Sequence, residues 1–285
     1  VAQPENYALM GDLRALVAGY QRRFMVSEAP DDPIGFGSLG AGSSAFAFGH
    51  QTDILAAARG DASAAARVAN YFPGAPLTMS TMLSNHDSFA GTRVWNQLNG
   101  NESQYRLAAA TYLLQPGTPF IYYGEEIGMS TAPLAGDPGL RPPMSWSVDA
   151  STAGFTTGTP FRALASNAAA RNVAAQSADP GSLLSFYKAM LALRNTRPSI
   201  ARGSYVQAKA QGPVLSFRRE LDGEATLVVI NYGSAAAQAN IQGLRPGAVL
   251  QALYPAAAAS GMAADEAGRV AVAAGAQSVQ VFALR

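Results

Sequence analysis

The chain has 285 residues, of which 48% are hydrophobic and 14% charged, and this composition excludes a disordered polypeptide. Its formal net charge is +1, with no basic stripe and no cluster of lysines, so nucleic acid is not expected as a partner. No apolar run approaches the roughly 20 residues of a membrane span, and Val1–Glu5 does not resemble a signal peptide. Membrane association is therefore not expected.

Cysteine is absent and only two histidines occur. These counts exclude a disulfide framework, a thiolate nucleophile and a metal centre built from cysteines or several histidines. The aspartates Asp31, Asp32, Asp53 and Asp61 lack the spacing of a calcium loop. No cofactor or metal is therefore expected in this chain. The absence of cysteine fits the cytoplasm and a secreted or periplasmic bacterial protein equally, so the location stays open.

The first 200 residues alternate between helical and strand patterns. In chain order, they predict a helix over residues 5–20, a buried strand Phe24–Val26, a loop over 30–44, a short strand Ala45–Phe48, helices near 52–59 and 62–71, a strand Leu77–Leu83, a helix over 102–115, a strand Phe120–Tyr123, a long loop to about residue 180 and a helix over 182–196. About four strand–helix units result, and strands that alternate with helices form a parallel sheet. We therefore expect an α/β fold here.

After Pro198 the pattern changes to short β runs separated by turns. These runs are Leu215–Phe217, Thr226–Asn231, Val249–Tyr254, Val270–Ala273 and Ser278–Leu284, and residues 255–267 are expected to form a loop. Such spacing is typical of an antiparallel β-sandwich. The sequence thus predicts two domains, over residues 1–200 and 201–285.

A polar triplet, Asn85-His86-Asp87, follows an apolar run that ends at Leu83. It offers an amide, an imidazole and a carboxylate at the C-terminal end of a buried strand. An α/β barrel keeps its active site at this end of its strands. The triplet is therefore the first candidate for a functional site.

Four stretches carry a family resemblance: residues 24–29 (FMVSEA), 83–87 (LSNHD), 116–129 (PGTPFIYYGEEIGM) and 141–146 (RPPMSW). Together they make the chain resemble the α-amylase family of glycoside hydrolases, especially its oligo-α-glucosidase-like members. The third stretch is long and very specific, and the resemblance covers nearly the whole chain. It implies the second half of a TIM (β/α)8 barrel, strands five to eight, followed by a C-terminal antiparallel β-sandwich domain.

The resemblance also implies what this chain lacks. A complete barrel takes about 250 residues, whereas only about 200 precede the β-sandwich. The family carries its nucleophilic aspartate on the fourth strand in a Gly-Phe-Arg-x-Asp-like segment, and no such segment occurs here. We therefore expect an N-terminal segment to complete the barrel, to supply the nucleophile and to hold any calcium site.

Two carboxyl groups fit catalytic roles that the resemblance implies. Glu28 corresponds to the general acid/base, at the end of an apolar strand where desolvation favours a carboxyl that keeps its proton. Asp87 corresponds to the carboxylate that grips sugar hydroxyls as the ring flattens toward the oxocarbenium ion. His86 is expected to donate to the same sugar. The structural alternative is an Asp87 that caps its loop beside a partly buried imidazole.

Three further residues are candidates for substrate binding. Arg93 either pairs with a catalytic carboxylate or touches sugar, or it is a plain surface arginine. Arg141 and Trp146 shape the sugar-entry side by resemblance, and Trp146 either stacks on a pyranose ring or is a packed loop residue. His50 is expected to be structural, and the adjacent glutamates at 125–126 to belong to loop architecture.

The resemblance implies a retaining enzyme that acts on α-linked glucosyl oligosaccharides or polysaccharides, with this chain carrying part of its machinery. Two alternatives stay open. One is a non-catalytic carbohydrate-binding or interaction protein that has kept the fold and lost the nucleophile. The other is a transglycosylase, such as a sucrose-acting family member, because the sequence does not separate water from sugar as the acceptor.

Overall fold

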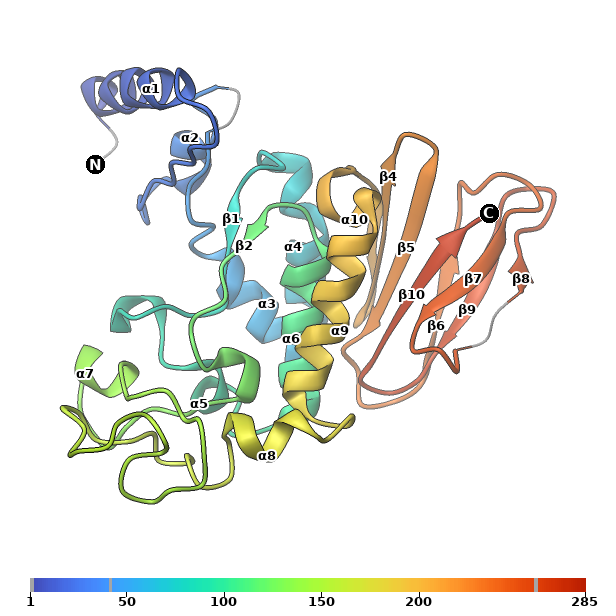
Figure 1. The fold of residues 1–285 in the computed structure, drawn as a ribbon. Helices are drawn as coiled ribbons and strands as arrows, with labels where there is room; N and C mark the ends of the chain where they lie inside the picture. The colour runs from blue at the N-terminus through green and yellow to red at the C-terminus, as the bar shows by residue number, and fades with distance from the viewer. Residues whose placement is uncertain (1–2, 41–42, 259–260) are drawn as a thin grey trace.

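A computed structural model describes residues 3–40, 43–258 and 261–285. Most helices gather on one side of the molecule and an antiparallel sheet lies on the other (Figure 1). In the described residues, the helices are α1 (Pro4–Ala18), α2 (Pro33–Gly37), α3 (His50–Ala58), α4 (Ala62–Asn70), α5 (Val94–Gln97), α6 (Glu102–Leu114), α7 (Asp137–Leu140), α8 (Val173–Ser177), α9 (Leu183–Thr196) and α10 (Pro198–Arg202). The strands are β1 (Ser80–Thr81), β2 (Thr118–Pro119), β3 (Ser204–Gln211), β4 (Val214–Leu221), β5 (Glu224–Asn231), β6 (Ala237–Ile241), β7 (Val249–Tyr254), β8 (Met262–Ala263), β9 (Val270–Ala274) and β10 (Ser278–Leu284).

Four short segments of the first part run parallel to one another in chain order. Ser27 pairs with Ala45, and Phe46 pairs with Ser80, as isolated bridges. Strand β1 then pairs with β2 in parallel. Within the described ranges this ladder does not return on itself, so the segments form an open, partial barrel.

The predicted strands of this part are longer than the observed ones. Phe24–Val26 forms no strand, Leu77–Leu83 contracts to β1, and Phe120–Tyr123 lies beyond β2. A ladder needs hydrogen-bonding neighbours, and within the described residues the first segment pairs at a single bridge, Ser27 with Ala45. The Phe120 amide still donates to the Thr81 carbonyl at 2.7 Å, and residues 121–123 belong to a loop that the hydroxyls of Tyr122 and Tyr123 hold in place. Apolar character alone therefore overestimated the extent of these strands.

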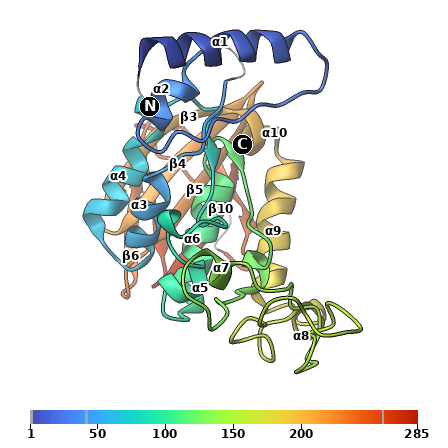
Figure 2. The same cartoon turned by 90° about the vertical axis from the view of Figure 1, so that its left-hand side faces the viewer.

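Helices α3, α4, α6 and α9 pack together beside the parallel segments (Figures 1 and 2). Three of them begin at capping residues, since the side chains of Asp61, Asn101 and Ser182 each accept a hydrogen bond from a backbone amide of the first turn. All four agree with the predicted ranges to within two residues. No helix in the described residues is long and apolar enough to cross a membrane.

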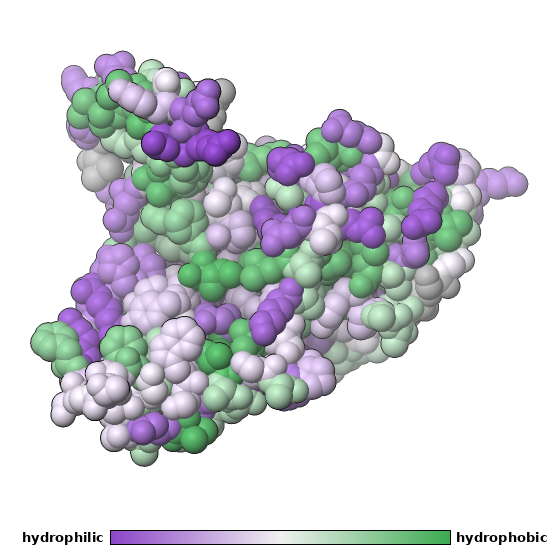
Figure 3. All heavy atoms as spheres, in the orientation of Figure 1, coloured by the Kyte–Doolittle hydropathy of each residue, from purple (hydrophilic) through white to green (hydrophobic). Residues whose placement is uncertain are grey.

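Helix α1 differs from these because none of its residues is buried. Leu9, Leu13 and Leu16 are 57%, 40% and 61% exposed. Their spacing of four and three places them on one face of the helix. Figure 3 shows apolar side chains among the polar ones here, and a hollow between the α1–α2 region and the loops around α7.

The C-terminal part contains an antiparallel sheet with the strand order β3-β4-β5-β10-β7-β8, and a second sheet of β6 and β9. Alternate residues of a strand point to opposite faces. One face of the larger sheet packs against the helices through Leu215, Phe217, Val228, Ile230 and Val281. The other packs against β6 and β9 through Val214, Leu227, Val229 and Phe282. The larger sheet is thus covered on both faces.

Three of these strands are absent from the predicted β runs. Strands β3 and β6 carry polar residues at many positions and have few apolar ones to signal them, and β8 falls within the predicted loop 255–267. Strands β3 and β8 also lie at the two edges of the sheet. An edge strand buries fewer side chains, so its hydrophobic pattern is weaker.

Two buried arginines hold the end of α6. Arg194 of α9 donates from Nη1 to the carbonyls of Leu113 and Gln115 at 2.9 and 3.0 Å. Arg219 of β4 donates to the carbonyls of Leu114 and Gly203 at 3.2 and 2.8 Å. Burial lowers the pKa of Arg194 to about 10 and that of Arg219 to about 9. Cations at a helix C-terminus satisfy its free carbonyls and its dipole.

The apolar cluster of the helices continues into the sheet without a break. It includes Leu107 of α6, Tyr187 of α9, Ile230 of β5 and Val281 of β10. The predicted domain boundary between residues 200 and 201 stays a prediction, because this apolar cluster contains residues from both predicted domains.

Candidate active site

The parallel segments all end at one edge, and two of the predicted site residues, Glu28 and Asp87, follow these ends. Glu28 comes directly after the Ser27 bridge. Asp87 follows β1, and Tyr122 and Tyr123 follow β2. The carboxyl ends of parallel strands share one edge of the sheet, where α/β folds bind ligands.

Glu28 is exposed to solvent in this chain. It borders a small hollow that Asn6, Leu9 and Phe36 also line. The expectation that a buried strand end desolvates the Glu28 carboxyl is therefore wrong for this structure. The physical reason is the open edge, because no further strand packs on that side of Ser27 in the described residues.

Asp87 is held by its neighbours in the predicted motif. Its backbone amide donates to Asn85 Oδ1 at 2.8 Å, which fixes the turn that begins the loop. Its Oδ2 lies 3.5 Å from His86 Nε2, and its Oδ1 lies 2.7 Å from Arg141 Nη2. The Asp87 side chain keeps 25% of its surface exposed, so the carboxylate remains accessible to a ligand.

Arg141 connects the loop after β1 with the loop after β2. Its Nε donates to the His86 carbonyl at 2.9 Å, and its Nη2 lies 3.2 Å from Asp137 Oδ2. Asp137 in turn accepts from the Ser88 amide at 2.8 Å. This hydrogen bond from the Ser88 amide is the main reason why the pKa of Asp137 is lowered. Arg141 thus orients Asp87, and a direct contact between Arg141 and sugar stays a prediction.

Arg93 is only 2% exposed, so its interpretation as a plain surface arginine is wrong. Its Nε donates to the Leu140 carbonyl at 3.0 Å and its Nη1 to the Tyr123 carbonyl at 2.8 Å. Its guanidinium lies 4.6 Å from the ring centre of Tyr122 and 4.8 Å from that of Tyr123. Arg93 therefore braces the loop that follows β2, and its contact with sugar or with a catalytic carboxylate remains a prediction.

The two tyrosines extend this bracing. Tyr122 donates to the Leu140 carbonyl at 3.0 Å, and Tyr123 donates to the Pro142 carbonyl at 2.7 Å. These contacts hold Tyr122 and Tyr123 beyond the end of the ladder and fix the position of Arg141.

Trp146 is 49% exposed, so it is not the fully packed loop residue of the structural alternative. It lines a cleft of about 530 Å³ together with Tyr123, Glu126, Arg141, Pro142, Pro143, Met144, Phe155, Phe161 and Arg162. Because Arg141 lines the cleft and also touches Asp87, the two features are continuous.

Glu125 belongs to the motif of residues 116–129 and is buried in the structure. The motif alone does not show which residues it contacts. Its Oε1 accepts from the Tyr112 hydroxyl at 2.6 Å and from the Tyr187 hydroxyl at 2.8 Å. Burial raises its pKa to about 7. Glu125 thus ties the loop after β2 to α6 and α9, which agrees with the architectural role expected for it.

His50 is also buried, as expected for a structural residue. Its Nε2 lies 3.0 Å from Gln115 Oε1, and its ring stacks on Tyr71 at 3.9 Å between centres. Burial lowers its pKa to about 4.

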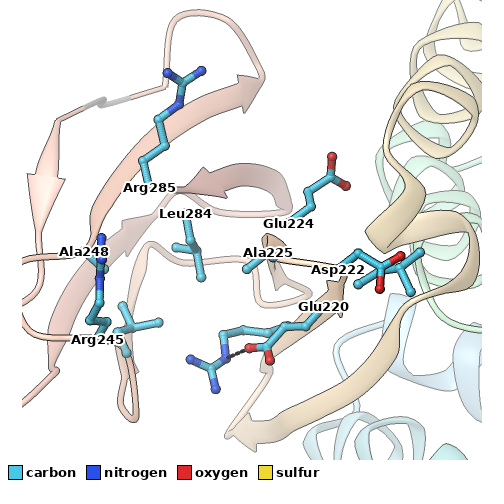
Figure 4. Close-up of a pocket in the computed structure, with 12 residues that line it drawn as sticks. Glu220, Asp222, Glu224, Ala225, Arg245, Ala248, Leu284 and Arg285 are labelled. Atoms are coloured by element: carbon cyan, nitrogen blue, oxygen red, sulfur yellow. Dashed lines mark ion pairs between the residues drawn. The ribbon is translucent and has the colours of Figure 1, made fainter.

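Another hollow, of about 560 Å³, lies in the sheet near the β4–β5 turn and the end of β10 (Figure 4). Glu220, Asp222 and Glu224 line it together with Arg218, Arg245 and Arg285, and Arg218 pairs with Glu220 at 3.2 Å. These charges balance, and the hollow lacks the residues of the motif. In the described parts of the chain, no three His, Asp or Glu side chains gather as a metal site would require.

Comparison with known proteins identifies the family. Residues 49–203 match the family model described as "Alpha amylase, catalytic domain", which is more than half of the chain. The chain belongs to the alpha-amylase family. The matched segment of this chain includes Asp87, Arg141 and Trp146, whereas Glu28 lies before it.

Relatives within the alpha-amylase family include alpha-amylase SusG of Bacteroides thetaiotaomicron, 36% identical over 167 residues, which are 56% of this chain and 23% of that protein. Trehalose synthase of Thermus thermophilus is 41% identical over 150 residues, 49% of this chain and 15% of that protein. The alpha-amylase of H. orenii has a similar fold, with a TM-score of 0.74 at 20% identity, covering 99% of this chain and 57% of that one. The chain thus spans less than two thirds of each of these proteins.

Proposed function

We propose that this chain is the C-terminal portion of a retaining α-glucoside hydrolase, namely the second half of a (β/α)8 barrel followed by a β-sandwich domain. The enzyme would act on α-linked glucosyl oligosaccharides or polysaccharides. The observation that carries this proposal is the pairing of Asp87 with Arg141 at the carboxyl edge of the parallel segments. Membership of the alpha-amylase family supports it.

An N-terminal segment completes the barrel in this proposal. The exposed face of α1, with Leu9, Leu13 and Leu16, supports a missing neighbour, because a solvated helix does not normally carry such a stripe. Phe24, 55% exposed beside the Ser27 bridge, supports the same conclusion for the edge of the ladder. We assign the nucleophilic aspartate and any calcium site to that segment.

Retaining hydrolysis requires two carboxyl groups about 5–5.5 Å apart on the two sides of the reacting carbon. In our assignment, the aspartate of the N-terminal segment attacks the anomeric carbon while Glu28 protonates the departing oxygen. Glu28 then removes a proton from the water that releases the glucosyl unit. Closure of the barrel would shield Glu28 from solvent, which this role needs.

In this assignment Asp87 binds the sugar, and the neighbouring residues fix the position of Asp87. A carboxylate can accept hydrogen bonds from the sugar hydroxyls most strongly when the ring is flattened in the transition state. Such a contact lowers the activation barrier of the reaction rather than the Michaelis constant. The imidazole of His86 is exposed next to it and can donate to the same sugar. Arg141 fixes the orientation of Asp87, Arg93 braces the loop that carries Arg141, and Trp146 lines the side on which the departing group lies.

Transfer of the glucosyl unit to an acceptor other than water is the second candidate. The names of two similar proteins favour it, the trehalose synthase of Thermus thermophilus and a trehalulose synthase of Pseudomonas mesoacidophila whose fold matches at a TM-score of 0.72. Both chemistries share the same two carboxyl groups and differ in what attacks the glucosyl-enzyme.

Glu28→Gln in the protein assembled with its N-terminal segment tests the assignment. Hydrolysis of maltooligosaccharides should fall about 10²–10⁴-fold, because general acid catalysis is lost. An aryl α-glucoside with a good leaving group should retain its first step, since it needs little protonation. Glu266→Gln, at an exposed position of the C-terminal part, is the matched control. Unchanged turnover of maltooligosaccharides by Glu28→Gln would refute the role of Glu28.

A further inference from the structure

The cleft that Trp146 lines is mostly apolar. Its volume of about 530 Å³ lies in the range of small-molecule sites. Its apolar walls are Tyr123, Pro142, Pro143, Met144, Trp146, Phe155 and Phe161. A hollow with such walls favours ligands that have apolar surface to bury.

Three aromatic rings of this cleft face the solvent. Trp146, Phe155 and Phe161 are 49%, 53% and 93% exposed. The guanidinium of Arg162 lies over one face of the Phe161 ring, 5.4 Å from the ring centre. Clustered exposed aromatic residues mark binding surfaces, because water solvates them poorly.

Among the charged side chains of the cleft, Arg141 is engaged by the protein itself and Arg162 lies over the Phe161 ring. Arg141 uses Nε and Nη2 on the His86 carbonyl and on Asp87 and Asp137. Burial raises the pKa of the Glu126 carboxyl, and the backbone amides of Glu126 and Gly124 oppose this shift. A second sugar ring would bring several hydroxyl groups that each need a partner once they leave water. An apolar ring makes no such demand.

The cleft is joined to Asp87 through a single residue. Arg141 lines the cleft and lies 2.7 Å from Asp87 Oδ1. A ligand whose sugar is held by Asp87 therefore extends past Arg141 when its other end fills the cleft.

We propose that this cleft binds an aromatic group attached to the α-glucosyl unit, so that aryl α-glucosides are preferred over α-linked disaccharides. The inference rests on the proposed function for the position of the sugar. It adds the chemical class of the group on the other side of the glycosidic bond.

Calorimetric titration of the protein assembled with its N-terminal segment, carrying Glu28→Gln so that no ligand is hydrolysed, tests this with three ligands: phenyl α-D-glucopyranoside, methyl α-D-glucopyranoside and maltose. The phenyl glucoside should bind about tenfold more tightly than either of the others, because only it buries an aromatic ring. Phe161→Ala should remove most of this preference without disturbing the fold, since the Phe161 side chain is 93% exposed. Trp146→Ala is the second variant.

Val148→Ala is the matched control, because Val148 is an exposed apolar residue of the same loop that does not line the cleft. Equal affinity for the phenyl and methyl glucosides, or binding of none of the three, overturns the proposal. So does tighter binding of maltose, which would make the cleft a sugar subsite. A change in self-association of Phe161→Ala, seen by ultracentrifugation without a change in glucoside binding, would assign the cleft to a protein interface. The Glu28→Gln assay judges the catalytic proposal separately.

Discussion

Arg141 holds Asp87 through a charged hydrogen bond of 2.7 Å between Nη2 and Oδ1, and the same guanidinium donates from Nε to the His86 carbonyl at 2.9 Å. Two donors of one planar group thus fix two consecutive residues of the motif. Two contacts from one planar group set direction as well as distance. They determine where Oδ2 of Asp87, which lies 3.5 Å from His86 Nε2, points.

Asp87→Asn in the assembled enzyme should lower turnover more than substrate affinity. The amide keeps the shape but loses the charge that binds the flattened, cationic ring most strongly. Loss of one such interaction costs about 10²-fold in kcat. Steady-state kinetics on a maltooligosaccharide measures both constants. A raised Michaelis constant with unchanged kcat would reduce Asp87 to an ordinary binding contact.

Arg141→Lys should reduce kcat without removing the positive charge. A lysine ammonium cannot reproduce the planar pair of contacts to Asp87 and the His86 carbonyl, so Asp87 loses its fixed orientation. We expect about a tenfold loss of kcat, smaller than that of Asp87→Asn. Arg245→Lys in the loop between β6 and β7 is the control. Wild-type kinetics for Arg141→Lys would show that charge alone suffices.

Glu125→Gln should make the protein more stable at alkaline pH. The folded-state pKa of about 7 lies above the ordinary value of 4.5, so the folded protein favours the protonated form. Stability is therefore lost as the pH rises through this window, and on the order of 3 kcal/mol is at stake. Denaturant unfolding near pH 5 and near pH 8 should show a smaller loss for Glu125→Gln than for the wild type. Parallel curves for the two proteins would contradict this.

His50→Gln should act in the opposite direction. The pKa of His50 falls from 6.5 to about 4 on burial, so the folded protein favours the neutral ring. Stability is then lost as the pH falls from about 6.5 to about 4. The variant should show less acid destabilisation than the wild type in the same unfolding series. A double variant with Glu125→Gln tests whether the two opposing slopes cancel in the wild type.

Arg219→Met should destabilise the chain by about 3 kcal/mol, because buried carbonyls lose their donor. The affected groups are the carbonyls of Leu114, Gly203 and Ser204, the last at 3.0 Å from Arg219 Nε. Arg202→Met, at an exposed position, is the control. Equal unfolding free energies of the two variants would show that water replaces the guanidinium without loss.

The sequence predicted the elements whose signals are local. Asp61, Asn101 and Ser182 mark helix starts, and the helices found there need no distant partner to be recognised. The short parallel strands depend on neighbours far along the chain, so their extent could not be derived from Leu77–Leu83 or Phe120–Tyr123 alone.

The candidate site shows the same division. The position of Asp87 at a strand end follows from the pattern around it. Its pairing with Arg141 joins residues 54 positions apart, and the burial of Arg93 depends on the carbonyls of Tyr123 and Leu140. Such pairs arise when two loops meet at one edge, which no periodicity encodes. The catalytic and binding roles of Glu28 and of the other named residues remain predictions.

The continuous apolar cluster between the helices and the sheet limits how this protein can be engineered. A cut near Gly203 would leave the outer sides of α6 and α9 facing water, together with Leu215, Phe217 and Val281 on the separated piece. A C-terminal module grafted from another protein would have to present the same apolar face and an arginine in place of Arg219. Exchange of the β part therefore means redesign of a shared interior, not the joining of two finished units.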